Sequence, residues 1–68
     1  MDLDNNMKDR LNRIEQLSKI YKEFLDKNDQ DHALAISMLD KHLLKTWFYS
    51  SSTREDYVLA VRTYLGYE

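Results

Sequence analysis

The residues best suited to metal chemistry lie in the stretch DKNDQD, which begins at Asp26. Asp26, Asn28 and Gln30 occupy positions 1, 3 and 5 of a calcium-binding loop, where oxygen ligands are required. The pattern then fails, because position 6 holds Asp31 instead of the glycine that makes the sharp turn. Position 12 holds Ser37 instead of a bidentate glutamate. The stretch is therefore predicted to be a turn between helices.

Histidine and serine side chains are the other candidates for chemistry. His32 and His42 are ten residues apart. On a helix this spacing separates them by about 80° and about 15 Å. Zinc needs three or four convergent ligands, so we expect no metal and no cofactor. No histidine stands in a recognisable relation to the run Ser50–Ser52, and so short a chain has little room for a concave pocket. An enzyme is not expected.

Length and composition predict one small domain over residues 1–68. The chain has no cysteine, which excludes disulfides and fits a reducing compartment. The first ten residues are acidic and polar where a signal peptide would be apolar, and no apolar run is long enough to span a membrane. We therefore expect a soluble, cytoplasmic protein.

The elements that would position any site are helices. The chain has no proline and one glycine, Gly66, so only turn and cap chemistry can interrupt a helix. Apolar residues recur at helical spacing in three segments, near 4–27, 30–49 and 53–65. The predicted fold is all-α, a small antiparallel three-helix bundle. Gly66 is expected to end the last helix in a left-handed conformation, with Tyr67 packing back on the final turn.

Polar residues before the second and third segments predict the helix starts. Asn28 or Asp29 is expected to cap the second helix, where the helix dipole favours negative charge. Ser52 or Thr53 is expected to cap the third, because Ser52 and Glu55 have the spacing of a capping box.

The predicted core joins one apolar stripe from each helix. Trp47 is expected to be part of it, because it continues the stripe of Leu39 and Leu43 at helical spacing. The first helix contributes a face that begins at Met7. The full set is Leu11, Ile14, Leu17, Tyr21, Phe24, Ile36, Leu39, Leu43, Trp47, Val61 and Tyr64.

Asp40 is an unusual residue in this pattern, because the helical wheel places it beside Trp47. We expect it at the edge of the core, where it reaches water or the indole N–H. The alternative is an ion pair across an interface with an arginine, such as Arg10, Arg13 or Arg62.

The second helix carries apolar residues on two sides, which is more than two neighbouring helices require. Large apolar side chains left on the surface of so small a chain indicate a shared surface. Aromatic residues and methionine are enriched at interface cores, and lysines around them favour an acidic partner. The predicted partner-binding patch contains Leu34, Met38, Lys41, His42, Lys45, Phe48 and Tyr49.

These features predict a small protein–protein interaction module, a regulator or inhibitor that binds a partner protein. The acidic turn at Asp26, Asp29 and Asp31 could receive the basic rim of a second copy, so a homo-oligomer is one version. The competing interpretation is that the stems of Lys41 and Lys45 cover the apolar residues and nothing binds.

Two other functions use the same residues differently. Three short helices could form a helix-turn-helix that binds nucleic acid. The net charge of −2 argues against it, and the third helix offers only Arg54 and Arg62 against Glu55 and Asp56. Five tyrosines with nearby arginines could instead stack a nucleotide base, which predicts a small-ligand site at a subunit interface.

Overall fold

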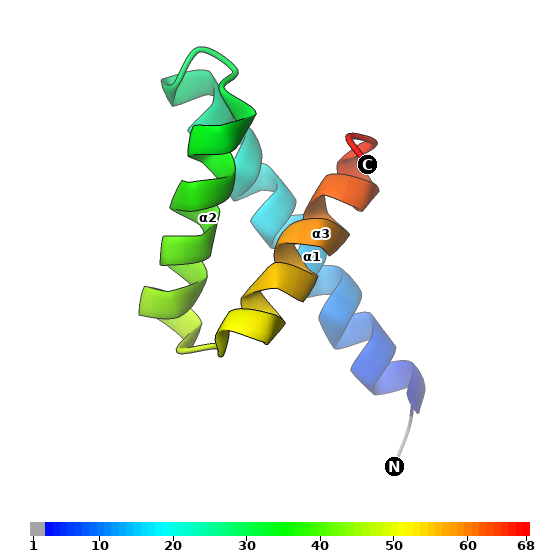
Figure 1. Cartoon of the computed structure of the whole chain (residues 1–68). Helices are drawn as coiled ribbons and strands as arrows, with labels where there is room; N and C mark the ends of the chain where they lie inside the picture. The colour runs from blue at the N-terminus through cyan, green and yellow to red at the C-terminus, as the bar shows by residue number, and fades with distance from the viewer. Residues whose placement is uncertain (1–2) are drawn as a thin grey trace.

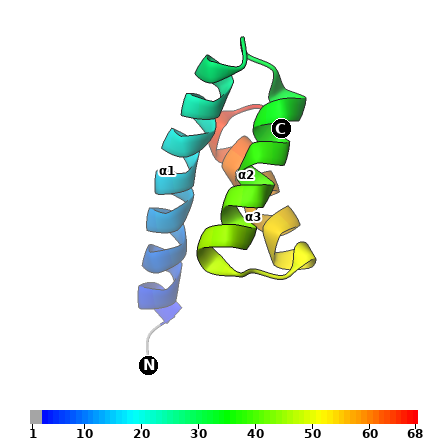
Figure 2. The same cartoon turned by 90° about the vertical axis from the view of Figure 1, so that its left-hand side faces the viewer.

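Three helices make up the bundle. The computed structural model describes residues 3–68, with side chains described from Lys8 onward. The helices are α1 (Leu3–Lys27), α2 (His32–Trp47) and α3 (Ser51–Leu65), and each of them packs against the other two. α2 runs back along α1, and α3 returns across α1 (Figures 1 and 2). The predicted all-α three-helix bundle is confirmed, with no strand in the described residues.

The helices differ in length, and this decides what the core can cover. α1 has 25 residues, whereas α2 has 16 and α3 has 15. At a rise of 1.5 Å per residue, α1 is about 14 to 15 Å longer than its two neighbours. Leu11, near the start of α1, remains 51% exposed, so its predicted place in the core is wrong. Met7 lies outside the described side chains.

The turn between α1 and α2 is longer than the sequence pattern predicts. Asp29 and Gln30 both have positive φ angles, 55° and 64°, and the amide of Gln30 donates to the carbonyl of Leu25 at 2.7 Å. These residues therefore end α1 and cannot begin α2. The cap of α2 is Asp31, whose carboxylate accepts from the amide of Leu34 at 3.2 Å. The prediction of Asn28 or Asp29 as the cap is wrong.

Ser50 is the residue that begins α3. Its side chain accepts from the amide of Thr53 at 3.4 Å, and its carbonyl accepts the first helical bond, from Arg54. The cap predicted at Ser52 or Thr53 is wrong by at least two residues. Phe48 causes the shift: it ends α2 in the left-handed region, at φ 57°, so the chain turns earlier than expected.

The end of α3 follows the prediction. Gly66 has φ 87°, a conformation that costs glycine little because it has no Cβ atom. The amide of Gly66 donates to Thr63 and the amide of Tyr67 donates to Arg62, the two bonds that satisfy the last carbonyls of a helix.

The core lies between the three helices. On α2 its centre is Ala35, Leu39 and Leu43, so this helix is rotated from the predicted stripe toward its smallest apolar residue. Trp47 is 37% exposed and Tyr64 is also exposed, so their predicted places in the core are wrong. The buried residues are Ile14, Leu17, Ser18, Tyr21, Leu25, Ala35, Leu39, Leu43, Tyr57 and Val61, with Phe24, Ile36 and others half-buried against them.

Candidate functional site

Trp47, Tyr49 and Tyr57 form an aromatic stack at the connection between α2 and α3. The rings of Trp47 and Tyr49 are 6.0 Å apart and nearly parallel, and those of Tyr49 and Tyr57 are 5.2 Å apart. Arg13 of α1 lies over Trp47, with 4.6 Å from its guanidinium carbon to the ring centre. The same group donates to the hydroxyls of Tyr49 at 2.8 Å and Tyr57 at 3.4 Å. Arg13 thus holds the connection between α2 and α3 against α1.

This stack changes the expected place of Tyr49. Its side chain turns inward and packs half-buried against the core, so the prediction that Tyr49 faces outward is wrong. Arg10 lies 4.9 Å from the centre of the Tyr57 ring. Two of the five tyrosines that suggested a base-stacking site, Tyr49 and Tyr57, are therefore paired with arginines inside this fold.

A second polar cluster joins the other end of α3 to α1. Arg62 donates to the buried hydroxyl of Tyr21 at 2.7 Å, and this hydroxyl lies 2.8 Å from Nδ1 of His32. Because Arg62 can only donate, the Tyr21 hydroxyl accepts from it. The ring of Tyr67 packs edge-on against His32, with 4.5 Å between centres. Arg62 also donates to Glu68 at 2.6 Å.

The pKa values of Arg13 and Arg62 are both above that of an ordinary arginine. Hydrogen bonding to Tyr57 raises the pKa of Arg13, against an opposing effect of burial. Hydrogen bonding to Glu68 raises the pKa of Arg62 in the same way. Their charge is therefore a fixed part of the fold at physiological pH.

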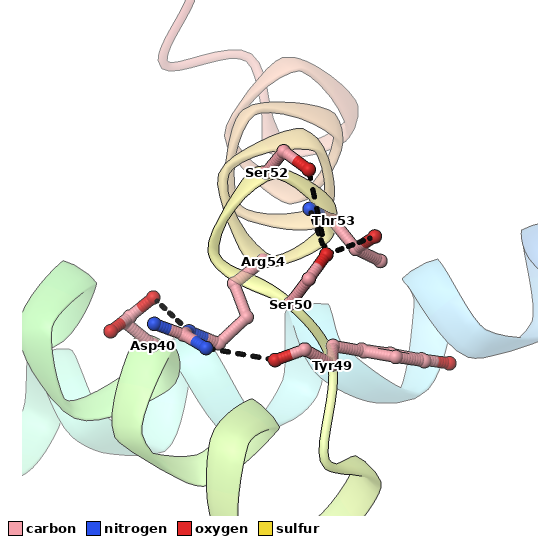
Figure 3. Close-up of polar contacts among 6 residues, drawn as sticks. All are labelled: Asp40, Tyr49, Ser50, Ser52, Thr53 and Arg54. Atoms are coloured by element: carbon pink, nitrogen blue, oxygen red, sulfur yellow. Dashed lines mark hydrogen bonds and ion pairs between the residues drawn. The ribbon is translucent and has the colours of Figure 1, made fainter.

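Asp40 pairs with an arginine of its own chain. Its carboxylate accepts from Nε of Arg54 at 2.8 Å, and Arg54 also donates to the backbone carbonyl of Tyr49 at 2.8 Å (Figure 3). The partner is none of the three arginines suggested by the sequence. Arg54 and Arg62, the two arginines of a would-be reading helix, are both engaged in bonds within the bundle.

The predicted patch on α2 is only partly on the surface. Leu34 is 49% exposed and Phe48 is 83% exposed. Met38 and His42 are half-buried, as Tyr49 is. Met38 has its sulfur 3.1 Å from the amide nitrogen of Asn28, and His42 packs edge-on against Phe24 of α1.

What remains exposed or half-exposed of the patch follows one line along α2. Leu34, Met38, Lys41 and Lys45 fall within about 60° of one another at 100° per residue, and Phe48 follows at the cap. We call these five residues the outer stripe. It combines apolar side chains with two exposed lysines. Whether it binds a partner stays a prediction.

A larger apolar surface surrounds Leu59 on α3. Leu59 is 54% exposed and forms a wall shared by two hollows. One hollow, between α2 and α3, has a volume of about 420 Å³; the other, between α1 and α3, has about 460 Å³. We call the apolar residues that line them the Leu59 surface: Leu11, Ile14, Ile36, Val58, Leu59, Ala60 and Tyr64.

The position of Leu59 in the sequence is a signal for this surface, although Leu59 belongs neither to the predicted patch nor to the predicted core. On the helical wheel Leu59 points away from Tyr57 and Val61, the buried residues of α3. The exposure of Leu11 and Tyr64 could not be seen in the sequence, because it depends on the different lengths of the helices and on how α1 and α3 cross (Figure 1).

The hollow between α2 and α3 presents negative charge to the solvent. Its lining includes the carboxylates of Asp40, Glu55 and Glu68 and a single cationic group, Arg62, which is paired with Glu68. In the pairs Arg54–Asp40 and Arg62–Glu68 the arginine side chains are only 16% exposed, whereas the acidic side chains are 41% and 42% exposed. In each pair the positive partner is half-buried, and the negative partner is the more exposed of the two.

Comparisons with known proteins add no identification. No family model, curated protein or solved structure matches this chain. Among the described residues, no helix is long and apolar enough to cross a membrane. In the same part of the chain, no three histidine or acidic side chains are grouped so that they could hold a metal ion.

Proposed function

We propose that this chain is a small protein-interaction module that binds a partner protein through the Leu59 surface. The observation that carries the proposal is the position of Leu59, a half-exposed leucine between two apolar hollows on one side of α3. Grooves between helices are a common binding place for a helix from another protein, which inserts apolar residues spaced three or four apart. An exposed apolar surface of this kind can bind another protein, and we therefore expect the chain to act as a regulator or inhibitor.

The energetics of a short chain support the same proposal. A chain of 68 residues buries only about 60% of the surface that its unfolded form exposes. An apolar side chain that stays exposed therefore withholds apolar area from a core that is already small. Leu11, Leu59 and Tyr64 all remain exposed around the same hollow. Contiguous apolar exposure of this kind is typical of interaction sites.

Site-specific photo-cross-linking tests the proposal in cells that make the protein. A photoreactive amino acid replaces Leu59, and a matched protein carries it at Glu23, an exposed polar position of α1 outside both hollows. A discrete cross-linked protein is expected from position 59 only. Its identity is then determined, and its affinity is measured with purified wild type and Leu59→Asp.

The expected loss for Leu59→Asp is at least about tenfold in affinity, because a charged group then enters the centre of an apolar contact. Circular dichroism of the variant should match wild type, since Leu59 packs little in the free bundle. Equal affinity of the two proteins would show that the Leu59 surface is not the binding site.

A further inference from the structure

We propose that the hollow between α2 and α3 binds the outer stripe of a second copy of this chain. The inference rests on the proposed function, since this hollow is half of the Leu59 surface, and it names the occupant. Two surfaces of the same chain remain exposed on the bundle: an apolar hollow with three carboxylates in its lining, and a face of α2 that combines apolar side chains with two lysines. One contact between copies would use both.

The outer stripe supplies apolar side chains and positive charge. Leu34 and Phe48 are exposed, and Met38 is half-exposed along the same side of α2. Lys41 and Lys45 lie between them, and neither takes part in an ion pair in the described structure. This is the composition of a basic amphipathic helix, which binds a groove through its apolar side chains.

The hollow supplies the matching floor and rim. Ile36, Val58 and Leu59 form an apolar floor, and the exposed carboxylates lie around it. Glu55 has no ion-pair partner in the described structure, and Asp40 presents its carboxylate outward although it is bonded to Arg54. At Glu55 an arriving lysine therefore meets a carboxylate that no cation occupies in the described structure.

The lengths of the two surfaces also agree. The α3 side of the hollow extends from Glu55 to Arg62, seven residues, which is about 10 Å along the helix. The stretch from Leu34 to Lys41 is also seven residues long, about two turns. A helix of this length can place Leu34 and Met38 on the floor with Lys41 at the rim.

Charge favours this arrangement over a symmetric pair. A two-fold axis that passes through either surface would make that surface meet itself. Two acidic hollows would then bring Glu55 toward Glu55 of the other copy, and two outer stripes would bring Lys41 toward Lys41. Placing the stripe of one copy in the hollow of the next joins opposite charges at every contact. Such a head-to-tail contact forms rings or chains of copies.

The test combines two single variants, each of which disables one surface. Leu59→Asp disables the hollow, and Leu34→Asp disables the stripe; both replaced leucines are about half exposed, so the bundle should fold. Mass in solution is measured by sedimentation from about 10 µM to about 1 mM, the range expected for a small interface. Wild type should form species larger than a dimer as concentration rises, and each variant alone should stay monomeric.

The mixture of the two variants is the decisive sample. Leu34→Asp keeps an intact hollow and Leu59→Asp keeps an intact stripe, so one productive contact remains between them. We expect a one-to-one dimer and nothing larger. A mixture that stays monomeric while wild type associates would mean a symmetric contact and would overturn the inference, as would a wild type that stays monomeric throughout.

A charge exchange provides a second readout that does not depend on the leucine variants folding. Glu55→Lys and Lys41→Glu should each weaken association at least about tenfold, and the double variant should recover most of that loss. No recovery would contradict the pairing of stripe and hollow. A monomeric wild type that still loses its cross-linked partner on Leu59→Asp would reject the second copy as occupant and leave the proposed function intact.

Discussion

Arg13 on α1 and Trp47 at the end of α2 are in direct contact, with the guanidinium carbon 4.6 Å from the centre of the indole ring. This contact explains why Trp47 is not in the core. The ring lies at the edge of the bundle, where it contacts the guanidinium of Arg13 and stacks on Tyr49. A cation over an indole ring stabilises a partly exposed position that a leucine could not use in the same way.

Replacement of Arg13 by lysine should therefore destabilise the bundle. Lysine keeps the charge but loses the planar group that lies on Trp47 and reaches two tyrosine hydroxyls. We expect the free energy of unfolding to fall by about 1–2 kcal/mol, from a cation–π contact and hydrogen bonds of about 0.5–1.5 kcal/mol each. Urea unfolding followed by circular dichroism measures this change, and fluorescence of Trp47, the single tryptophan, reports the local loss.

The matched control is Lys19→Ala, a change at an exposed position of the same helix. It should alter the free energy of unfolding by less than about 0.5 kcal/mol. Equal effects of the two substitutions would mean that the contact between Arg13 and Trp47 does not hold the connection.

The number and order of the helices could be predicted from sequence because period and turn residues are local signals. The rotation of α2 could not. Ala35 is fully buried, and its small side chain lets α2 approach its neighbours. A helical wheel gives alanine little hydrophobic weight, so the pattern alone does not indicate that this face is buried. Leu25 and Tyr57 were likewise missing from the predicted core, although both lie on the expected faces.

The candidate site was harder to predict because it depends on the backbone of one residue. If Phe48 continued the helix, Tyr49 would point outward and complete the predicted patch. The left-handed conformation of Phe48 redirects the chain, so that Tyr49 stacks on Tyr57 instead. No residue type in this stretch predicts such a turn. The left-handed region is normally occupied by glycine or asparagine, and position 48 is a phenylalanine.

The corrected core predicts that two leucines of the expected core behave differently. Leu43 is fully buried, so Leu43→Ala should lower the free energy of unfolding by about 2–5 kcal/mol. Leu11 is half exposed in the hollow between α1 and α3, and Leu11→Ala should cost less than about 1 kcal/mol. Thermal unfolding by circular dichroism separates them. Similar losses for both variants would place Leu11 in the core after all.

The aromatic stack predicts a loss of stability in alkaline solution. Burial raises the pKa of the Tyr49 phenol above its ordinary value of 10.0, the neighbouring Tyr57 raises it further, and Arg13 opposes both. Because the folded pKa exceeds the unfolded one, this contribution is fully present below pH 10 and is lost as pH rises through the folded pKa. Absorbance of tyrosinate and circular dichroism should therefore change together above pH 10.

Tyr49→Phe tests the assignment of this effect to Tyr49. At neutral pH the variant should be less stable by about 0.5–1.5 kcal/mol, because the hydrogen bond from Arg13 is lost. The difference from wild type should shrink in alkaline solution, since phenylalanine cannot ionise. A constant difference at every pH would assign the alkaline transition to one of the other four tyrosines, given five in the chain.

Phe48 combines two unfavourable properties in one residue. Its side chain is 83% exposed, and its backbone has φ 57° and ψ 31°, a conformation that costs a residue with a Cβ atom about 1–2 kcal/mol. Backbone strain of this kind is concentrated at binding sites, where another function maintains it. Phe48 lies at the end of the outer stripe, so contact with the second copy would explain why an exposed phenylalanine stands where glycine fits better.

Phe48→Gly should therefore stabilise the monomer and weaken its association. Glycine removes the strain but loses more backbone entropy on folding, so we expect a gain of about 0.5–1 kcal/mol in the free energy of unfolding. Phe48→Ala is the matched control, because it removes the same ring and keeps the strain; its stability should stay near that of wild type. Both variants should associate more weakly in sedimentation. A Phe48→Gly protein that is more stable and associates as wild type does would exclude Phe48 from the contact.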